Sequence, residues 1–210
     1  MTLIEFLLAE LPPAPARVLE VGCGDGAVAR ELATAGYDVV AVDPNAPDGP
    51  IFRRTRLEAL DEPRPFDAAF AGRSLHHVDD LGIAVAKLAD LIRPGGVLVL
   101  DEFAWERLDE QTADWYYGQL RALGAARGAH APRSRNALMD EWNAEHAGLH
   151  TSDAMRTALA SRFRERSFSW EPYFHRELGT LAAEGLERTL IQTGAILALG
   201  FRYVGERVEA

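Results

Sequence analysis

The chain has 210 residues, of which 48% are apolar and 26% charged, a composition typical of a globular protein with a sizeable core. It carries 22 Lys and Arg residues against 32 Asp and Glu residues. The resulting formal charge of −10 repels phosphate backbones, so we expect no nucleic-acid partner. A single cysteine, Cys23, excludes an internal disulfide, and no Cys/His spacing predicts a metal site.

The first residues are apolar at helical spacing from Leu3 to Leu11, which predicts a short amphipathic helix that ends at Pro12. Glu5 and Glu10 interrupt this apolar run, and no basic residues precede it, so the run does not resemble a signal peptide. No apolar segment is long enough to span a membrane. We therefore expect a cytoplasmic protein with no membrane partner.

Short apolar strands alternate with helical segments between residues 17 and 103. The expected strands are Arg17–Val21, Asp38–Val42, Ile51–Arg54, Phe66–Phe70 and Val97–Leu100. The expected helices are Ala27–Ala35 and residues 80–92, the second of which stops at Pro94, Gly95 and Gly96. Strands and helices in this alternation predict right-handed crossovers and a doubly wound, Rossmann-like α/β sheet.

The pattern changes after residue 101. Residues 105–161 are predicted to be mostly helical, Phe163–Phe174 a strand, residues 180–198 a helix and Phe201–Val208 a final strand. Since no repeat or linker separates these parts, we expect one domain over residues 1–210. Its parts are an N-terminal helix (1–16), a cofactor-binding core (17–104), a helical insertion or lid (105–162) and a C-terminal strand-helix-strand segment (163–210).

A glycine loop, Gly22-x-Gly24-x-Gly26, runs directly from the first strand into a helix. Glycines at such a turn let the backbone approach a ligand closely, although the same spacing also satisfies the dinucleotide fingerprint. Glu20 and Asp25 place carboxylates beside the loop, where a pyrophosphate requires N–H donors and no anion. The loop therefore favours a ligand with a cationic amine and sulfonium, such as S-adenosylmethionine, over NAD.

Asp43 ends the second strand, about twenty residues after the first glycine. A carboxylate at this position accepts hydrogen bonds from both ribose hydroxyls, which suits NAD and S-adenosylmethionine equally. Pro44 would then lie against the adenine. The alternative is that Asp43 only caps the turn Asp-Pro-Asn.

Four motifs occur in order over residues 17–103: VLEVGCGDG, AVDPN, FDAAFAGRSLHHVDDL and LIRPGGVLVL. Together they resemble the class I S-adenosylmethionine-dependent methyltransferases that act on small molecules. The resemblance implies a seven-stranded sheet of order 3-2-1-4-5-7-6 with strand 7 antiparallel. It also implies S-adenosylmethionine as cofactor, S-adenosylhomocysteine as product and a small-molecule methyl acceptor. The sequence identifies neither the acceptor nor the oligomeric state.

The resemblance also implies cofactor-binding residues. The methionine part would be held by Glu20, Gly22, Cys23 and Gly24, with Asp25 and Gly26 nearby, and the ribose by Asp43. Arg56 occupies the position at which many members present an acid to the adenine amino group, so Leu57 would contribute only packing and its N–H there. Ala71 and Gly72, just after the fourth strand, would lie near the methyl-donating sulfur.

A general base is required only if the acceptor loses a proton as it attacks. His76 and His77 follow the fourth strand at the edge of the sheet where ligands bind in such folds, and an imidazole titrates near neutral pH. One of them is therefore a candidate base. The alternative is that Leu-His-His simply begins the next helix, with one ring packed and the other in solvent.

The segment after the fifth strand is rich in aromatic residues. As a lid it would supply an apolar wall to an acceptor pocket, with Trp105, Tyr116, Tyr117 and Trp142 as candidates. The alternative is that these residues form ordinary core, because the consecutive Trp115, Tyr116 and Tyr117 cannot share one helix face.

Two other functions remain open. An NAD(P)-dependent oxidoreductase would use the same glycine spacing, although Glu20, Asp25 and the two C-terminal strands argue against it. A non-catalytic cofactor-binding protein of the same fold would show cofactor affinity without turnover of any acceptor.

Overall fold

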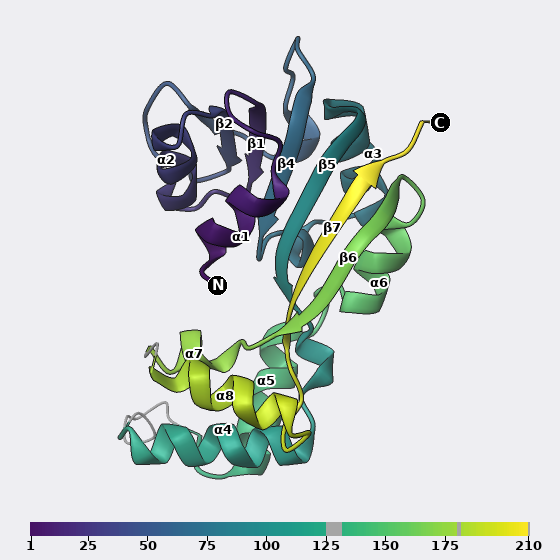
Figure 1. The fold of residues 1–210 in the computed structure, drawn as a ribbon. Helices are drawn as coiled ribbons and strands as arrows, with labels where there is room; N and C mark the ends of the chain where they lie inside the picture. Colours follow the sequence, from purple (N-terminus) through teal and green to yellow (C-terminus); the bar gives the residue numbers. More distant parts are fainter. Residues whose placement is uncertain (125–131, 180–181, 210) are drawn as a thin grey trace. The chain divides into compact units, whose positions relative to one another are not determined.

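The computed structural model describes residues 1–124, 132–179 and 182–209 (Figure 1). These residues form two compact units. The first comprises Met1–Glu102, Asp153–Ser169 and the residues from Arg202 onward, and the second Phe103–Ser152 and Trp170–Phe201. The organisation as one domain with an insertion stays a prediction.

The strands pair into a seven-stranded sheet of order β3-β2-β1-β4-β5-β7-β6. The strands are β1 (Arg17–Val21), β2 (Asp38–Asp43), β3 (Phe52–Arg54), β4 (Phe66–Gly72), β5 (Ile92–Phe103), β6 (Phe163–Glu171) and β7 (Gly200–Arg207). In Figure 1, β7 runs in the direction opposite to β5 and β6. The expected α/β class, strand order and antiparallel last strand are confirmed.

Strand β1 lies between β2 and β4 and is parallel to both. Its last residue, Val21, pairs with Val42 on one side and Ala71 on the other. The chain leaves β1 toward β2 and later returns on the other side as β4, which makes this a topological switch point. Ligands in open α/β sheets bind beside the carboxyl ends of the strands at such a point.

Two helices of the first unit, α1 (Leu3–Glu10) and α2 (Ala27–Thr34), pack on one face of the sheet. Phe6 and Leu7 of α1 and Leu32 of α2 belong to one buried apolar cluster with strand residues such as Val18. Helix α1 begins with a capping box in which Thr2 and Glu5 satisfy each other's backbone N–H groups. The unit also contains α3 (Leu81–Leu91), capped by Asp80, and most of α6 (Ser152–Leu159).

The second unit holds the helices α4 (Glu110–Ala122), α5 (Arg135–His146), α7 (Phe174–Glu177) and α8 (Ala182–Gln192). Its core is aromatic, with Phe103, Trp142, Tyr173, Phe174 and Leu199 at the centre. The buried Glu187 of α8 accepts hydrogen bonds from three consecutive backbone N–H groups, those of residues 173–175, at 2.7–2.9 Å. One carboxylate therefore satisfies the N-terminal donors of α7.

Three predicted elements have a boundary that is wrong by several residues. Strand β5 begins at Ile92 rather than Val97, and its register against β4 shifts so that the exposed residues 93–95 bulge out of the pairing. Strand β6 ends at Glu171, because Pro172 has no N–H to donate and Glu187 takes the following donors, so Phe174 starts a helix. Helix α8 ends at Gln192, where Gly194 adopts a left-handed conformation with φ +72°; residues 180–181 lie outside the described residues.

Among the residues that the structure describes, no helix has the length and apolar character required to cross a membrane.

Candidate cofactor site

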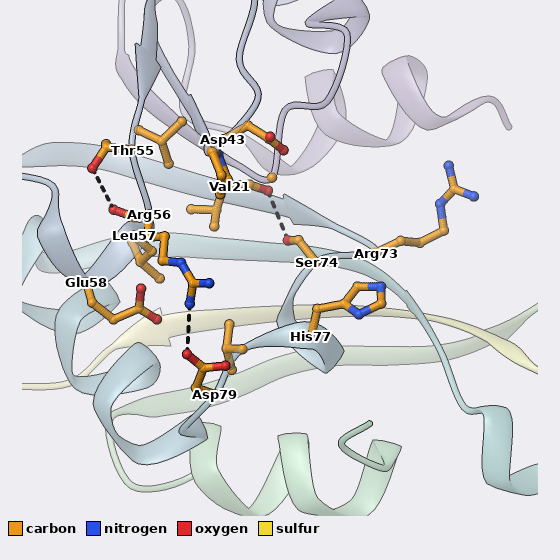
Figure 2. A pocket seen from close by; sticks show the side chains of 14 residues that line it. Val21, Asp43, Thr55, Arg56, Leu57, Glu58, Arg73, Ser74, His77 and Asp79 are labelled. Atoms are coloured by element: carbon orange, nitrogen blue, oxygen red, sulfur yellow. Dashed lines mark hydrogen bonds and ion pairs between the residues drawn. The ribbon is translucent and has the colours of Figure 1, made fainter. Parts of the chain in front are cut away.

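A pocket of about 300 Å³ opens at the carboxyl ends of β1, β2, β3 and β4, within the first unit (Figure 2). The turns after four strands supply its walls. The lining residues are Val21, Gly22, Val42, Asp43, Pro44, Thr55, Arg56, Leu57, Glu58, Arg73, Ser74, His77, Val78 and Asp79. The pocket therefore lies at the edge of the sheet where the switch point predicts a ligand.

The glycine loop is held against the end of β2. The backbone N–H groups of Gly22 and Cys23 both donate to the carbonyl oxygen of Val42, at 2.8 and 3.1 Å. Gly22 has φ +71°, and a Cβ there would lie 2.4 Å from the Cβ of Ser74. Gly24 has φ +52° and open space where its Cβ would be. Gly22 is thus required by protein packing, whereas Gly24 leaves free volume beside the loop.

Asp43 connects the glycine loop to the turn after β2. Its Oδ2 accepts a hydrogen bond from the Gly24 N–H at 3.1 Å, and its Oδ1 accepts one from the Asn45 N–H at 2.7 Å. The turn-capping role weighed from the sequence is therefore present. Each carboxylate oxygen has two lone pairs, so both oxygens retain acceptor capacity toward the pocket that Asp43 lines.

Glu20 does not line the pocket. It shares a face of β1 with Val18, the face covered by α2, and is only 3% exposed. Burial, together with the carboxylates of Asp25 and Asp43, raises the pKa of Glu20 to about 8, although the backbone N–H of Ala29 opposes this rise. Its Oε2 is buried without a hydrogen-bond partner among the described residues.

Cys23 is a buried member of the loop, not a reactive thiol. Burial and the nearby carboxylates of Glu20 and Asp43 raise the pKa of Cys23 to about 12. The thiol is therefore protonated at neutral pH, and a protonated thiol is a poor nucleophile.

One end of the pocket carries an ion pair between turns of different strands. Arg56, after β3, and Asp79, after β4, approach within 2.8 Å between Nη1 and Oδ2. Both side chains are exposed, so the pair contributes little to stability. Leu57, between Arg56 and Glu58, is buried and forms an apolar wall.

The turn after β4 is fixed by β5 and β1. Glu102, at the end of β5, accepts hydrogen bonds from the N–H groups of Ser74 and Leu75 at 2.7 Å, and its Oε2 lies 2.6 Å from Nδ1 of His76. The Ser74 hydroxyl donates to the carbonyl oxygen of Val21 at 3.0 Å. His76 is buried and outside the pocket lining, whereas the exposed His77 lines the pocket. Leu75–His77 is a 3₁₀ turn that precedes helix α3.

The pocket brings together only some of the residues expected from the sequence. Those that line it are Gly22, Asp43, Pro44, Arg56, Leu57 and His77. Those that do not are Glu20, Cys23, Gly24, Asp25, Gly26, Ala71, Gly72 and His76. The sequence analysis did not identify Arg73, Ser74 or Asp79 as pocket residues, although all three stand in the motif after β4. Their position close to the carboxyl end of a strand was the signal that could have identified them.

The aromatic candidates belong to the second unit. Trp142 is buried in its core with Phe103, and Trp105 and Tyr116 pack against that core. The Trp142 indole N–H donates to the carbonyl oxygen of Trp105 at 2.9 Å, and Tyr116 stacks on Phe174 at 4.1 Å between ring centroids. The Tyr117 hydroxyl donates to the carbonyl oxygen of Arg133. Trp105, Tyr116 and Trp142 therefore contribute to an apolar core, which was the alternative interpretation of the sequence. A role at an acceptor pocket stays a prediction.

Among the described residues, no group of three or more His, Cys, Asp or Glu side chains is arranged to hold a metal ion.

The strand order, the loop after β1 and the acid at the end of β2 define the class of α/β protein to which methyltransferases belong. The chain belongs to the methyltransferase domain family, whose model matches residues 1–161.

Individual relatives agree with this family. The chain is 32% identical to an uncharacterised methyltransferase of Mycobacterium tuberculosis over 136 residues, 58% of this chain and 66% of that protein. It therefore spans slightly less than two thirds of that relative's length. It is 29% identical to a ubiquinone biosynthesis O-methyltransferase of Xylella fastidiosa, over 71% of this chain and 67% of the relative. The crystal structure of an S-adenosylmethionine-dependent methyltransferase from Mesorhizobium loti superposes with a TM-score of 0.63 at 18% identity, covering 97% of this chain and 96% of the other. This last likeness supports the fold.

Proposed function

We propose that the protein is an S-adenosylmethionine-dependent methyltransferase that acts on a small-molecule acceptor. The observation that carries the proposal is Asp43, which lines the pocket at the end of β2 and also holds the glycine loop through Gly24. In this arrangement a ribose bound by Asp43 would lie directly beside the free volume at Gly24.

The residues present fit this cofactor. Asp43 would accept the ribose hydroxyls, while Pro44, Leu57 and the carbon chain of Arg56 would enclose the adenine. Asp25, beside the loop, would supply negative charge toward the methionine ammonium. Glu20, whose Oε2 has no hydrogen-bond partner among the described residues, would offer the ammonium a hydrogen-bond acceptor. The backbone at Gly22, Cys23, Gly24 and Gly26 would enclose the methionine part, and Ala71 and Gly72 would lie near the sulfur.

When bound, the cofactor would supply an activated methyl group on a sulfonium: the acceptor would bond to the methyl carbon in line as the carbon–sulfur bond breaks, and neutral S-adenosylhomocysteine would leave. The protein then contributes mainly position and exclusion of water. If the acceptor must lose a proton, His77 in the pocket or His76 on Glu102 is the proposed base. The expectation that residues 105–162 cover the acceptor, with Trp105, Tyr116, Tyr117 or Trp142 near the methyl group, stays a prediction.

The acidic composition supports a small acceptor rather than a nucleic acid, and a cytoplasmic location is part of the proposal. The relative named for ubiquinone biosynthesis also supports a small organic acceptor.

Calorimetry with S-adenosylhomocysteine, NAD and NADP tests the proposal. We expect saturable binding of S-adenosylhomocysteine and none of either dinucleotide; the reverse result would establish the oxidoreductase alternative. Release of S-adenosylhomocysteine from S-adenosylmethionine in the presence of an acceptor library then tests for catalysis. Binding without turnover of any library member would favour the non-catalytic alternative.

A further inference from the structure

Arg73 has an unusual backbone for its residue type. It follows β4 directly and has φ +49°, a left-handed conformation that side chains with a Cβ rarely adopt. Among the described residues it is the one non-glycine position with positive φ. Two hydrogen bonds to the end of β5 hold this conformation: the Arg73 N–H donates to the Asp101 carbonyl at 2.9 Å, and the next N–H, of Ser74, donates to Glu102. The surrounding structure thus holds Arg73 in a strained conformation. Strained residues of this kind cluster at functional sites.

The guanidinium of Arg73 differs from the other cation in the pocket. Arg56 is neutralised by Asp79 at 2.8 Å, whereas no hydrogen bond or ion pair joins the Arg73 guanidinium to another described residue. Figure 2 shows the Arg73 side chain extending away from the end of the pocket where Arg56 and Asp79 lie. The pocket therefore has one compensated cation at one end and one exposed, uncompensated cation at the other.

This second end is where the acceptor would bind. Under the proposed function, Asp43, Pro44 and Leu57 enclose the adenosine, and the sulfur lies near Ala71 and Gly72, which immediately precede Arg73. The Arg73 side chain therefore starts beside the methyl group and extends beyond it.

From this placement, and resting on the proposed function, we infer that Arg73 binds an anionic group of the methyl acceptor, a carboxylate or a phosphate. A guanidinium presents paired N–H donors that match the two oxygens of such a group. The protein as a whole has a charge of −10 and repels anions, so an anionic acceptor requires a local cation at the entrance to the site. The acceptor class that this predicts is a small organic acid or phosphate ester.

The test uses calorimetry on the protein saturated with S-adenosylhomocysteine. The probes are inorganic pyrophosphate, benzoate and benzamide, a neutral molecule of the same shape as benzoate. We expect saturable binding of at least one anion and at least tenfold weaker binding of benzamide. Arg73→Gln should weaken binding of that anion at least tenfold, and Arg73→Lys should retain part of it, because an ammonium keeps the charge without the paired donors.

Two further variants separate this role from general effects. Lys87→Gln removes one positive charge from α3, outside the pocket, and should leave anion binding unchanged. Arg73→Gly relieves the backbone strain, so it should be at least as stable as wild type and yet lose anion binding.

The inference is overturned if neither anion binds, or if Arg73→Gln binds the anion as wild type does. The inference is also overturned if Arg73→Gln weakens the binding of S-adenosylhomocysteine but not that of 5′-methylthioadenosine, which lacks the amino-acid part. Arg73 would then hold the carboxylate of the cofactor. If wild type fails to bind S-adenosylhomocysteine at all, the proposed function itself fails. Failure of the proposed function can be distinguished from failure of this inference, because binding of S-adenosylhomocysteine is measured before any anion is added.

Discussion

His76 and Glu102 form a buried pair in which Nδ1 of the imidazole lies 2.6 Å from Oε2 of the carboxylate. The other carboxylate oxygen of Glu102 accepts the N–H groups of Ser74 and Leu75. One side chain at the end of β5 therefore fixes both the backbone after β4 and the orientation of a histidine ring. With Nδ1–H donated to the carboxylate, a neutral His76 has its acceptor nitrogen at Nε2.

Replacing Glu102 by Ala should destabilise the protein by about 2–4 kcal/mol, because two buried donors and one partly buried donor lose their acceptor at once. Urea denaturation monitored by circular dichroism measures this change. The exposed Glu31 of α2 provides the control, since Glu31→Ala should stay within about 0.5 kcal/mol of wild type. Equal stabilities for the two variants would contradict the positioning role of Glu102.

Replacing Gly24 by Val should abolish binding of S-adenosylhomocysteine in a folded protein, because a branched side chain would fill the volume open beside the loop. Positive φ also strains valine, by about 1–3 kcal/mol. Gly36→Val is a matched control: Gly36 also has positive φ, at +95°, and its Cβ would make only an ordinary contact with Ala14. A Gly24→Val protein that binds as tightly as the Gly36→Val control would show that the loop does not approach the ligand.

Local sequence signals predicted the parts of the site that lie close together along the chain. Gly22, Gly24 and Asp43 are identified because a strand, a turn and a helix follow one another within a few residues, and the acid ends the next strand. The strand order required more than this: short apolar runs do not specify their neighbours, and the order came from the resemblance of the four motifs to one family.

Contacts between distant residues could not be predicted in the same way. Glu102 is one acid among 32 Asp and Glu residues, and its bonds to Ser74 and Leu75 span 28 and 27 positions of sequence. The ion pair of Arg56 with Asp79 spans 23 positions and depends on where two turns meet. The end of β6, in contrast, could have been predicted from the sequence, because Pro172 is disfavoured inside a strand.

Replacing Asp43 by Ala should weaken binding of S-adenosylhomocysteine by about 1–3 kcal/mol, because charge-assisted hydrogen bonds to the ribose are lost. Calorimetry measures the affinity. Asp48→Ala removes the same charge five residues further along, from an exposed side chain that pairs with Arg54 outside the pocket lining, and should leave the affinity unchanged. If the folded Asp43→Ala protein matches the Asp48→Ala control, the ribose assignment is wrong.

Glu20 should make the stability of the protein fall as the pH rises. Its pKa is raised from 4.5 to about 8 in the folded state, so between these values the folded protein binds a proton that the unfolded chain has released. The free energy of unfolding therefore decreases across this window. The destabilising effect of ionised Glu20 is absent below about pH 4.5 and complete above about pH 8. Glu20→Gln cannot ionise, so its stability relative to wild type should increase from pH 5 to pH 9 by about 4 kcal/mol. Urea denaturation of both proteins at several pH values measures the difference. A constant offset from the amide substitution would leave this slope unchanged, whereas parallel stability curves from pH 5 to pH 9 would show that Glu20 is ionised throughout.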